Sequence, residues 1–271
     1  MPEEPSTVGL LRSTDQLREA AIASAVGTLS LPAGSHGLDA GCGIGSHIGL
    51  LLSATSPGGR LTCLDSSGVH LAEAAEKAGG MEPPGRVSFR RGDVKDLPFE
   101  ADSFDWAWSV DCVGFIPGDP LDMIRGLARV VRPGGRVAIL LWSSQQLLPG
   151  YPFLEARLSG TRAGAAPASP DWPPERHPLR ALGWFSKAGL GALSAKSFVT
   201  DLRAPLSEAQ KRAIASLIEM RWGNPESELP QADMEIFRRL KDRSDPLSVV
   251  DSEDYFGFFT YSLFSGVVKG G

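Results

Sequence analysis

Residues Leu38 to Gly45 read Leu-Asp-Ala-Gly-Cys-Gly-Ile-Gly, so an acid stands two positions before three alternating glycines. A short apolar stretch ends at this acid, and the residues from Ile48 to Leu52 have the pattern of a helix. Glycines let a backbone pass close to a ligand, and the first turn of a helix directs free N–H groups towards it. The pattern predicts the strand–turn–helix ligand site of a doubly wound α/β domain.

The spacing of these glycines distinguishes two kinds of nucleotide cofactor. Dinucleotide folds use G-x-G-x-x-G, in which the third glycine allows close packing of helix on strand. Here Ser46 and Ile48 stand where that third glycine would fall in the two possible registers. The order acid-x-G-x-G-x-G resembles instead the first motif of the class I S-adenosylmethionine-dependent methyltransferases.

Two further acids follow expected strand ends. Asp65 ends the buried stretch Arg60–Asp65, beside the first strand, where a carboxylate can accept both hydroxyls of a ribose. An exposed acid at a strand end is the alternative interpretation. Asp93 follows the third strand, in a string that continues through Val94 and Leu97-Pro98-Phe99 to Phe104-Asp105.

This string resembles a segment of the ubiquinone/menaquinone-biosynthesis-like small-molecule branch, methyltransferase type 11. The resemblance covers about residues 36–142 and includes the turn Arg132-Pro133-Gly134-Gly135, with a weaker match at 182–203. It implies that Asp93 bonds the adenine amino group and that the backbone N–H of Val94 reaches a ring nitrogen. The cofactor-binding residues expected on these grounds are Asp39, Gly41, Gly43, Gly45, His47, Asp65, Ser66, Asp93, Val94 and Ser109.

The resemblance implies S-adenosylmethionine as cofactor, S-adenosylhomocysteine as product, and methyl transfer by in-line displacement. Such a transfer needs mainly alignment and exclusion of water, and it needs a base only when the acceptor keeps its proton. Asp111, just past the fourth strand, and His177, in a Pro-rich segment, are the candidate bases. Many relatives have a histidine near position 115, where this chain has Phe115. A surface histidine without a catalytic role is the alternative for His177.

Four aromatic residues are candidates for the wall of an acceptor pocket. Trp142 ends the fifth strand at the carboxyl edge of the sheet, where open α/β sheets bind ligands. Phe115, Tyr151 and Trp172 are the others, and plain core packing is the alternative. We therefore expect a small, apolar or aromatic acceptor.

Composition limits the other classes of function. The 271-residue chain has a net charge of −5 and shows no basic stripe, which argues against a nucleic-acid partner. No apolar run is long enough to span a membrane, and the first residues lack a signal-peptide layout, so a cytoplasmic location without membrane partners is expected. The three cysteines have no metal-type spacing, and no metal is expected.

Apolar periodicity and turn residues predict the elements. Helices are expected at about 13–29, opened by a Ser13/Gln16 capping box, at 119–131, at 179–188, after a Ser207/Gln210 capping box, and after Pro230. Strands are expected at 36–40, 60–65, 86–90, 104–109, 137–142, 196–203 and 255–268. This alternation predicts a Rossmann-like class I methyltransferase fold, with a mostly parallel seven-stranded sheet, an antiparallel last strand, helices on both faces and a helical cap.

The expected organisation follows from the same elements. Residues 1–35 form an N-terminal helical segment, 36–142 the S-adenosylmethionine-binding core, and 143–180 a Pro-rich lid or cap insertion. Residues 181–205 continue the core, 206–250 form a helical cap and 251–271 the last core strand. Two other functions remain open: a non-catalytic protein that binds S-adenosylmethionine or S-adenosylhomocysteine, and an NAD-dependent oxidoreductase. The sequence does not predict the oligomeric state.

Overall fold

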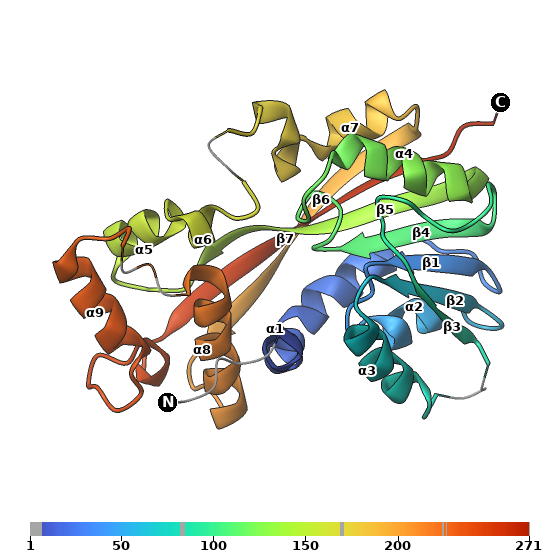
Figure 1. The fold of residues 1–271 in the computed structure, drawn as a ribbon. Helices are drawn as coiled ribbons and strands as arrows, with labels where there is room; N and C mark the ends of the chain where they lie inside the picture. The colour runs from blue at the N-terminus through green and yellow to red at the C-terminus, as the bar shows by residue number, and fades with distance from the viewer. Residues whose placement is uncertain (1–6, 82–84, 169–170, 224, 226, 271) are drawn as a thin grey trace. The chain divides into compact units, whose positions relative to one another are not determined.

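The structure is a computed structural model that describes residues 7–81, 85–168, 171–223, 225 and 227–270. Seven strands form one sheet in the order β3-β2-β1-β4-β5-β7-β6 (Figure 1). They are β1 (His36–Ala40), β2 (Arg60–Asp65), β3 (Val87–Arg91), β4 (Phe104–Val110), β5 (Val131–Gln146), β6 (Gly191–Arg203) and β7 (Phe256–Val267). The reversal of strand order at β1 and β4 is the switch point at which doubly wound sheets bind ligands.

Strands β3, β2, β1, β4 and β5 pair in parallel, and β7 runs antiparallel to β5. The backbone of Gly134 and Gly135, near the start of β5, bonds Val268 just past the end of β7. Further along β5, the ring of Trp142 lies against that of Tyr261. The predicted mostly parallel sheet with an antiparallel last strand is confirmed.

Helices connect and cover the strands. They are α1 (Thr7–Thr28), α2 (Ile48–Ala54), α3 (Gly68–Ala78), α4 (Pro120–Val130), α5 (Pro152–Ser159), α6 (Arg162–Ala165), α7 (Ala181–Lys187), α8 (Glu208–Trp222) and α9 (Gln231–Lys241), with 3₁₀ turns η1 (Pro174–Arg176), η2 (Pro178–Arg180) and η3 (Val249–Asp251). Helices α2 and α3 lie on one face of the parallel strands, and α4 and α7 lie side by side on the other (Figure 1).

Helix α4 shows how the sequence anchors these layers. Its N-cap, Asp119, accepts a hydrogen bond from the N–H of Leu121 at 2.9 Å, which satisfies one donor of the first turn. Met123, Ile124 and Leu127 follow at helical spacing and are buried in the core under β4 and β5. The helix predicted at 119–131 is therefore confirmed.

The chain forms two compact units, each made of several segments. The first comprises Met1–Ala20, Ser144–Asp171 and Val199–Thr260; the second comprises Ala21–Ser143, Trp172–Phe198 and Tyr261–Gly271. Within the first, the predicted Ser207/Gln210 capping box opens α8, and Pro230 precedes α9. The boundaries predicted from the sequence at 35, 142, 180, 205 and 250 stay a prediction.

Three predicted boundaries were wrong. Helix α1 begins at Thr7 rather than at residue 13, because Ser13 lies inside the helix and its hydroxyl donates to the carbonyl of Leu10. Strand β5 covers Val131–Gln146 rather than 137–142, since the turn at Gly134 is held in the sheet by its bond to Val268. Strand β6 begins at Gly191 rather than at 196.

The Pro-rich segment at 143–180, predicted to be a lid or cap insertion, contains regular structure. It comprises the end of β5, the short helices α5 and α6, and two 3₁₀ turns. Prolines at the first turn of α5, η1 and η2 occupy positions whose missing N–H costs nothing, so they start helical turns rather than breaking them. Residues 1–6 of the predicted N-terminal segment, and Pro170, lie outside the described residues.

Candidate cofactor and acceptor site

The glycine-rich loop joins β1 to α2 at the carboxyl edge of the sheet. Gly41 has φ +79° and Gly43 has φ +54°, both in the left-handed region that favours glycine. The N–H of Gly41 donates to the carbonyl of Leu64 at 2.8 Å, which ties the loop to the end of β2. A Cβ on Gly41 would lie 2.5 Å from the sulfur of Cys112, whereas one on Gly43 would meet nothing within 4 Å. Gly41 is therefore required for packing, and Gly43 keeps the loop surface open to a ligand.

Asp39, at the end of β1, is a buried acid. Its side chain is 1% exposed, and neither carboxylate oxygen has a hydrogen-bond partner among the described residues. Burial, with a smaller contribution from Asp65, raises the pKa of this carboxyl to about 7. Such a group is costly unless a ligand supplies positive charge or donors. Asp39 therefore fits a cofactor that has an ammonium group and a sulfonium.

Asp65, at the end of β2, is held in one orientation by donors from two elements. Its Oδ2 accepts from the N–H of Gly43 and its Oδ1 from the N–H of Ser67, each at 2.9 Å. The Nδ1 of His70 lies 3.4 Å from Oδ1. The carboxylate thus lies against the glycine loop, as a ribose ligand at this position requires.

Asp93 follows β3 and is more exposed than the other two acids. Its side chain is 45% exposed and forms an ion pair with Lys95 at 3.2 Å. Hydrogen bonding to the N–H of Lys95, with help from the ammonium group, holds the pKa of Asp93 below its usual range. The side chain of Val94, the next residue, is buried in the core.

The other predicted cofactor residues surround the same loop. His47 is the N-cap residue of α2, and Gly45 has φ +74° in the turn before it. The carbonyl of Ser66 accepts from the Nε of Arg91. Ser109 is fully buried in β4. The glycine loop, Asp65 and Ser109 therefore come from three adjacent strand ends.

Asp111 follows β4 and has the left-handed φ of +46°, unusual for a residue with a side chain. Its Oδ1 accepts from the backbone N–H of Trp142 at 2.8 Å, and its Oδ2 from the hydroxyl of Tyr261 at 2.6 Å. The ring of Trp142 packs edge-on against that of Tyr261, at 5.6 Å between centroids. One carboxylate thus joins the end of β4 to residues within β5 and β7.

The remaining acceptor candidates lie in different surroundings. Phe115 packs against the core of the second unit, and the guanidinium of Arg176 lies 5.2 Å above the ring of Trp172. His177 is exposed, and its Nδ1 accepts from the N–H of Leu179 at the start of η2. Tyr151 belongs to the first unit, as the N-cap residue of α5.

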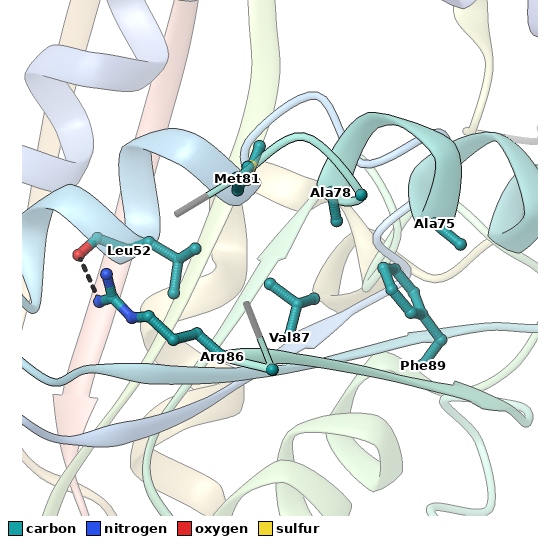
Figure 2. Close-up of a pocket in the computed structure, with 9 residues that line it drawn as sticks. Leu52, Ala75, Ala78, Met81, Arg86, Val87 and Phe89 are labelled. Carbon is teal, nitrogen blue, oxygen red and sulfur yellow. Dashed lines mark hydrogen bonds between the residues drawn. The ribbon is translucent and has the colours of Figure 1, made fainter. Parts of the chain in front are cut away.

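A separate cavity of about 200 Å³ lies between α2, α3 and β3. Its lining is mostly apolar and includes Met81 and Phe89, and Arg86 donates to the carbonyl of Leu52 (Figure 2). Arg86 also donates to the carbonyl of Gly59 at 2.7 Å, so its guanidinium ties the amino end of β3 to neighbouring turns. This cavity lies at the opposite edge of the sheet from the glycine loop.

No group of three or more metal-ligating side chains occurs among the residues that the structure describes. Within the same residues, no helix is both long and apolar enough to cross a membrane.

Two residues of the site were not identified from the sequence. His70 contacts Asp65 because α3 begins shortly after β2. A histidine in the first helical turn after a strand-end acid could have indicated this contact from the sequence. Tyr261 bonds Asp111 across 150 positions of sequence, and no local pattern indicates that contact.

Comparison with known proteins agrees with this fold. The structure of the YcgJ protein from Bacillus subtilis superposes with a TM-score of 0.58 at 19% identity, covering 93% of this chain and all of that one. The shared fold is the Rossmann-like fold of class I methyltransferases. Residues 38–135 match the family model described as a methyltransferase domain.

Two curated relatives are also named as methyltransferases. The methyltransferase GfsG of Streptomyces halstedii is 33% identical over 141 residues, which are 50% of this chain and 47% of that protein. The demethylmenaquinone methyltransferase of Staphylococcus aureus is 37% identical over 122 residues, 44% of this chain and 47% of that protein. The chain thus spans less than half the length of these relatives. Residues 38–135 of this chain thus match the methyltransferase domain that these relatives also resemble, and the cofactor of this domain is S-adenosylmethionine.

Proposed function

We propose that this protein transfers a methyl group from S-adenosylmethionine to a small, apolar or aromatic acceptor. The observation that carries the proposal is the pair of strand-end carboxylates on either side of the glycine loop. Asp39 is buried without a partner, and Asp65 is oriented by the N–H of Gly43. The positively charged amino-acid end of S-adenosylmethionine matches the carboxyl of Asp39, and its ribose diol matches the carboxylate of Asp65.

Each cofactor residue has a distinct role in this proposal. Asp39 stabilises positive charge near the loop, Asp65 accepts the ribose hydroxyls, and the exposed carboxylate of Asp93 accepts from the adenine amino group. The N–H of Val94 reaches an adenine ring nitrogen. Gly41, Gly43 and Gly45 allow close approach of the backbone, while His47, Ser66 and Ser109 complete the surroundings of the cofactor.

The cofactor supplies a methyl group that is already activated by its attachment to a sulfonium. The chain therefore has to align the acceptor and exclude water rather than generate a strong nucleophile. Trp142 and Phe115 are proposed to form the apolar wall, with Trp172 as a further pocket residue of the same unit, and the pocket role of Tyr151 stays a prediction from the sequence. A relative that acts on demethylmenaquinone supports an acceptor of this class.

Asp111 is the proposed general base for an acceptor that keeps its proton. Hydrogen bonds from Trp142 and Tyr261 favour the charged carboxylate and fix its orientation. His177 is the second candidate base.

Titration calorimetry with S-adenosylmethionine, S-adenosylhomocysteine and NAD tests the cofactor assignment. We expect micromolar binding of the first two and none of NAD. Asp65→Ala should weaken binding of both about 10- to 100-fold, because a charge-assisted hydrogen bond is lost. Asp93→Ala should weaken both as well. Unchanged affinities in either variant would contradict the role given to that acid, and binding of NAD alone would contradict the proposal.

The second candidate function is a protein that binds the cofactor without transferring its methyl group. The engagement of both Asp111 oxygens by Trp142 and Tyr261 favours it, since a residue in two structural bonds is a weaker base. A panel of phenols, quinols and amines, assayed by release of S-adenosylhomocysteine, separates the two. Tight cofactor binding with no turnover of any acceptor would favour the second function.

A further inference from the structure

The cavity between α2, α3 and β3 exists because small residues stand where α3 approaches the sheet. Ala75 and Ala78 are three positions apart, so their side chains lie on one face of the helix. Both line the cavity, opposite Val87 and Phe89 of β3 (Figure 2). A larger side chain at either alanine would fill this space, which instead has a volume of about 200 Å³.

Arg86 gives this apolar cavity a positive charge. It is the charged residue among the described lining residues, the others being apolar side chains and glycines. A guanidinium has five N–H donors. In Arg86, Nε donates to the carbonyl of Gly59 at 2.7 Å and one N–H of Nη2 to that of Leu52 at 3.4 Å, so three N–H groups stay available. Both partners are neutral, and no carboxylate of the described residues forms an ion pair with Arg86.

We propose that this cavity binds a small organic monoanion, a carboxylate attached to a single aromatic or alicyclic ring. The carboxylate accepts charge-assisted hydrogen bonds from the remaining N–H groups of Arg86. The ring lies among the apolar side chains, where the thioether of Met81 and the ring of Phe89 make favourable contacts with an aromatic group. This site is separate from the cofactor site and does not depend on the proposed function.

The volume and the charge of the cavity together select the ligand. A dry apolar cavity of about 150 Å³ accommodates benzene. The present cavity, at about 200 Å³, therefore accommodates one ring with a small substituent. Acetate has the charge but leaves the apolar walls uncovered, and benzamide has the shape without the charge. Benzoate has both properties, so these three compounds are the probes.

The methyl group of Met81 provides a direct readout of occupancy. Met81 lines the cavity, whereas Met123 and Met234 are buried elsewhere. NMR of ¹³C-methyl-labelled methionine in the full chain, without cofactor, follows titration with each probe. We expect benzoate to shift the Met81 signal saturably, with a Kd of about 0.1–10 mM, and to leave the other two signals unchanged. Benzamide and acetate should bind at least about tenfold more weakly.

Two variants test the walls and the charge. Ala78→Leu fills the cavity, and Ala72→Leu, at an exposed position of the same helix, is its control. Arg86→Gln removes the charge, and Arg90→Gln, at an exposed position of β3, is its control. Ala78→Leu and Arg86→Gln should each weaken benzoate binding at least about tenfold, whereas both controls should match the wild-type protein. Thermal unfolding checks that each variant is folded.

Equal affinity for benzoate and benzamide would overturn the proposal, because the charge of Arg86 would then not select the ligand. Acetate that binds as tightly as benzoate would overturn it too, since the apolar walls would contribute nothing. An unchanged Met81 signal, or benzoate affinity that is retained in Ala78→Leu, would exclude the cavity as the binding site. If Arg86→Gln does not fold, the comparison of benzoate with benzamide in the wild-type protein tests the charge.

Discussion

Asp39 is the residue whose environment departs most clearly from that of an ordinary surface acid. Its carboxyl has a pKa of about 7 in the folded chain, against 3.8 for the unperturbed group, because burial opposes the charge. The folded state therefore holds this proton more tightly than the unfolded state does. The contribution of Asp39 to the unfolding free energy is therefore highest below about pH 4 and falls by about 4 kcal/mol as the pH rises to about 7.

Asp39→Asn removes this titration. We expect the fall in unfolding free energy between pH 5 and pH 8 to be smaller in Asp39→Asn than in the wild-type protein by about 2–3 kcal/mol. Urea unfolding at the two pH values, without added cofactor, measures the difference. Asp122→Asn, on a carboxylate of α4 that is 70% exposed, is the control and should follow the wild-type protein. Equal pH dependence in Asp39→Asn and wild type would contradict the assigned pKa.

At this scale, the sequence indicates acids that stand at strand ends, since parallel strands bring their carboxyl ends to one edge. Asp39, Asp65 and Asp93 were identified in this way, and the structure gives each a place at that edge. The sequence does not indicate which residues contact each of these carboxylates. The hydrogen bond from Tyr261 to Asp111 and the contact of His70 with Asp65 depend on how other elements are placed.

At the scale of elements, Gly41 and Gly43, two of the three glycines in the turn between β1 and α2, are needed for different structural reasons. Both have positive φ, which costs a residue with a side chain about 1–2 kcal/mol. Only at Gly41 does an added Cβ also collide, with the sulfur of Cys112 at 2.5 Å. The loop therefore separates a packing position from a position that faces a ligand.

Gly41→Ala and Gly43→Ala form a matched pair of variants. Gly41→Ala should lower the unfolding free energy by about 2–4 kcal/mol, because steric overlap adds to the backbone cost. Gly43→Ala should lower it by about 1–2 kcal/mol but weaken binding of S-adenosylmethionine. Urea unfolding and calorimetry provide the two readouts. Equal destabilisation by the two substitutions would contradict the packing role of Gly41.

The elements themselves were predictable where local signals agree. The Ser207/Gln210 box opens α8 as expected, because capping uses residues three positions apart. The Ser13/Gln16 pair has the same spacing but lies within α1, where Ser13 bonds back to Leu10. The extension of β5 through Gly134 depends on Val268, at the far end of the chain, so local sequence could not reveal it.

At the scale of the whole molecule, the last strand completes a core that begins with the first. Strand β7 lies between β5 and β6, although it is the last in sequence. Phe264 of β7 is 4% exposed and packs in the same core cluster as Leu38 of β1 and Leu127 of α4. Folding of the cofactor-binding unit therefore requires the C-terminal strand.

This dependence predicts unequal effects along a single strand. Phe264→Ala should lower the unfolding free energy by about 3–5 kcal/mol, because it removes a buried ring from the core of the cofactor-binding unit. Phe256→Ala, at a position of β7 that is 48% exposed, should change it by no more than about 0.5 kcal/mol. Urea unfolding, followed by circular dichroism, compares the two. Because Phe264 lies far from the glycine loop in sequence yet shares a core with β1, we also expect Phe264→Ala to lower the temperature at which S-adenosylhomocysteine binding is lost. Similar small losses in both variants would mean that the unit folds without its last strand.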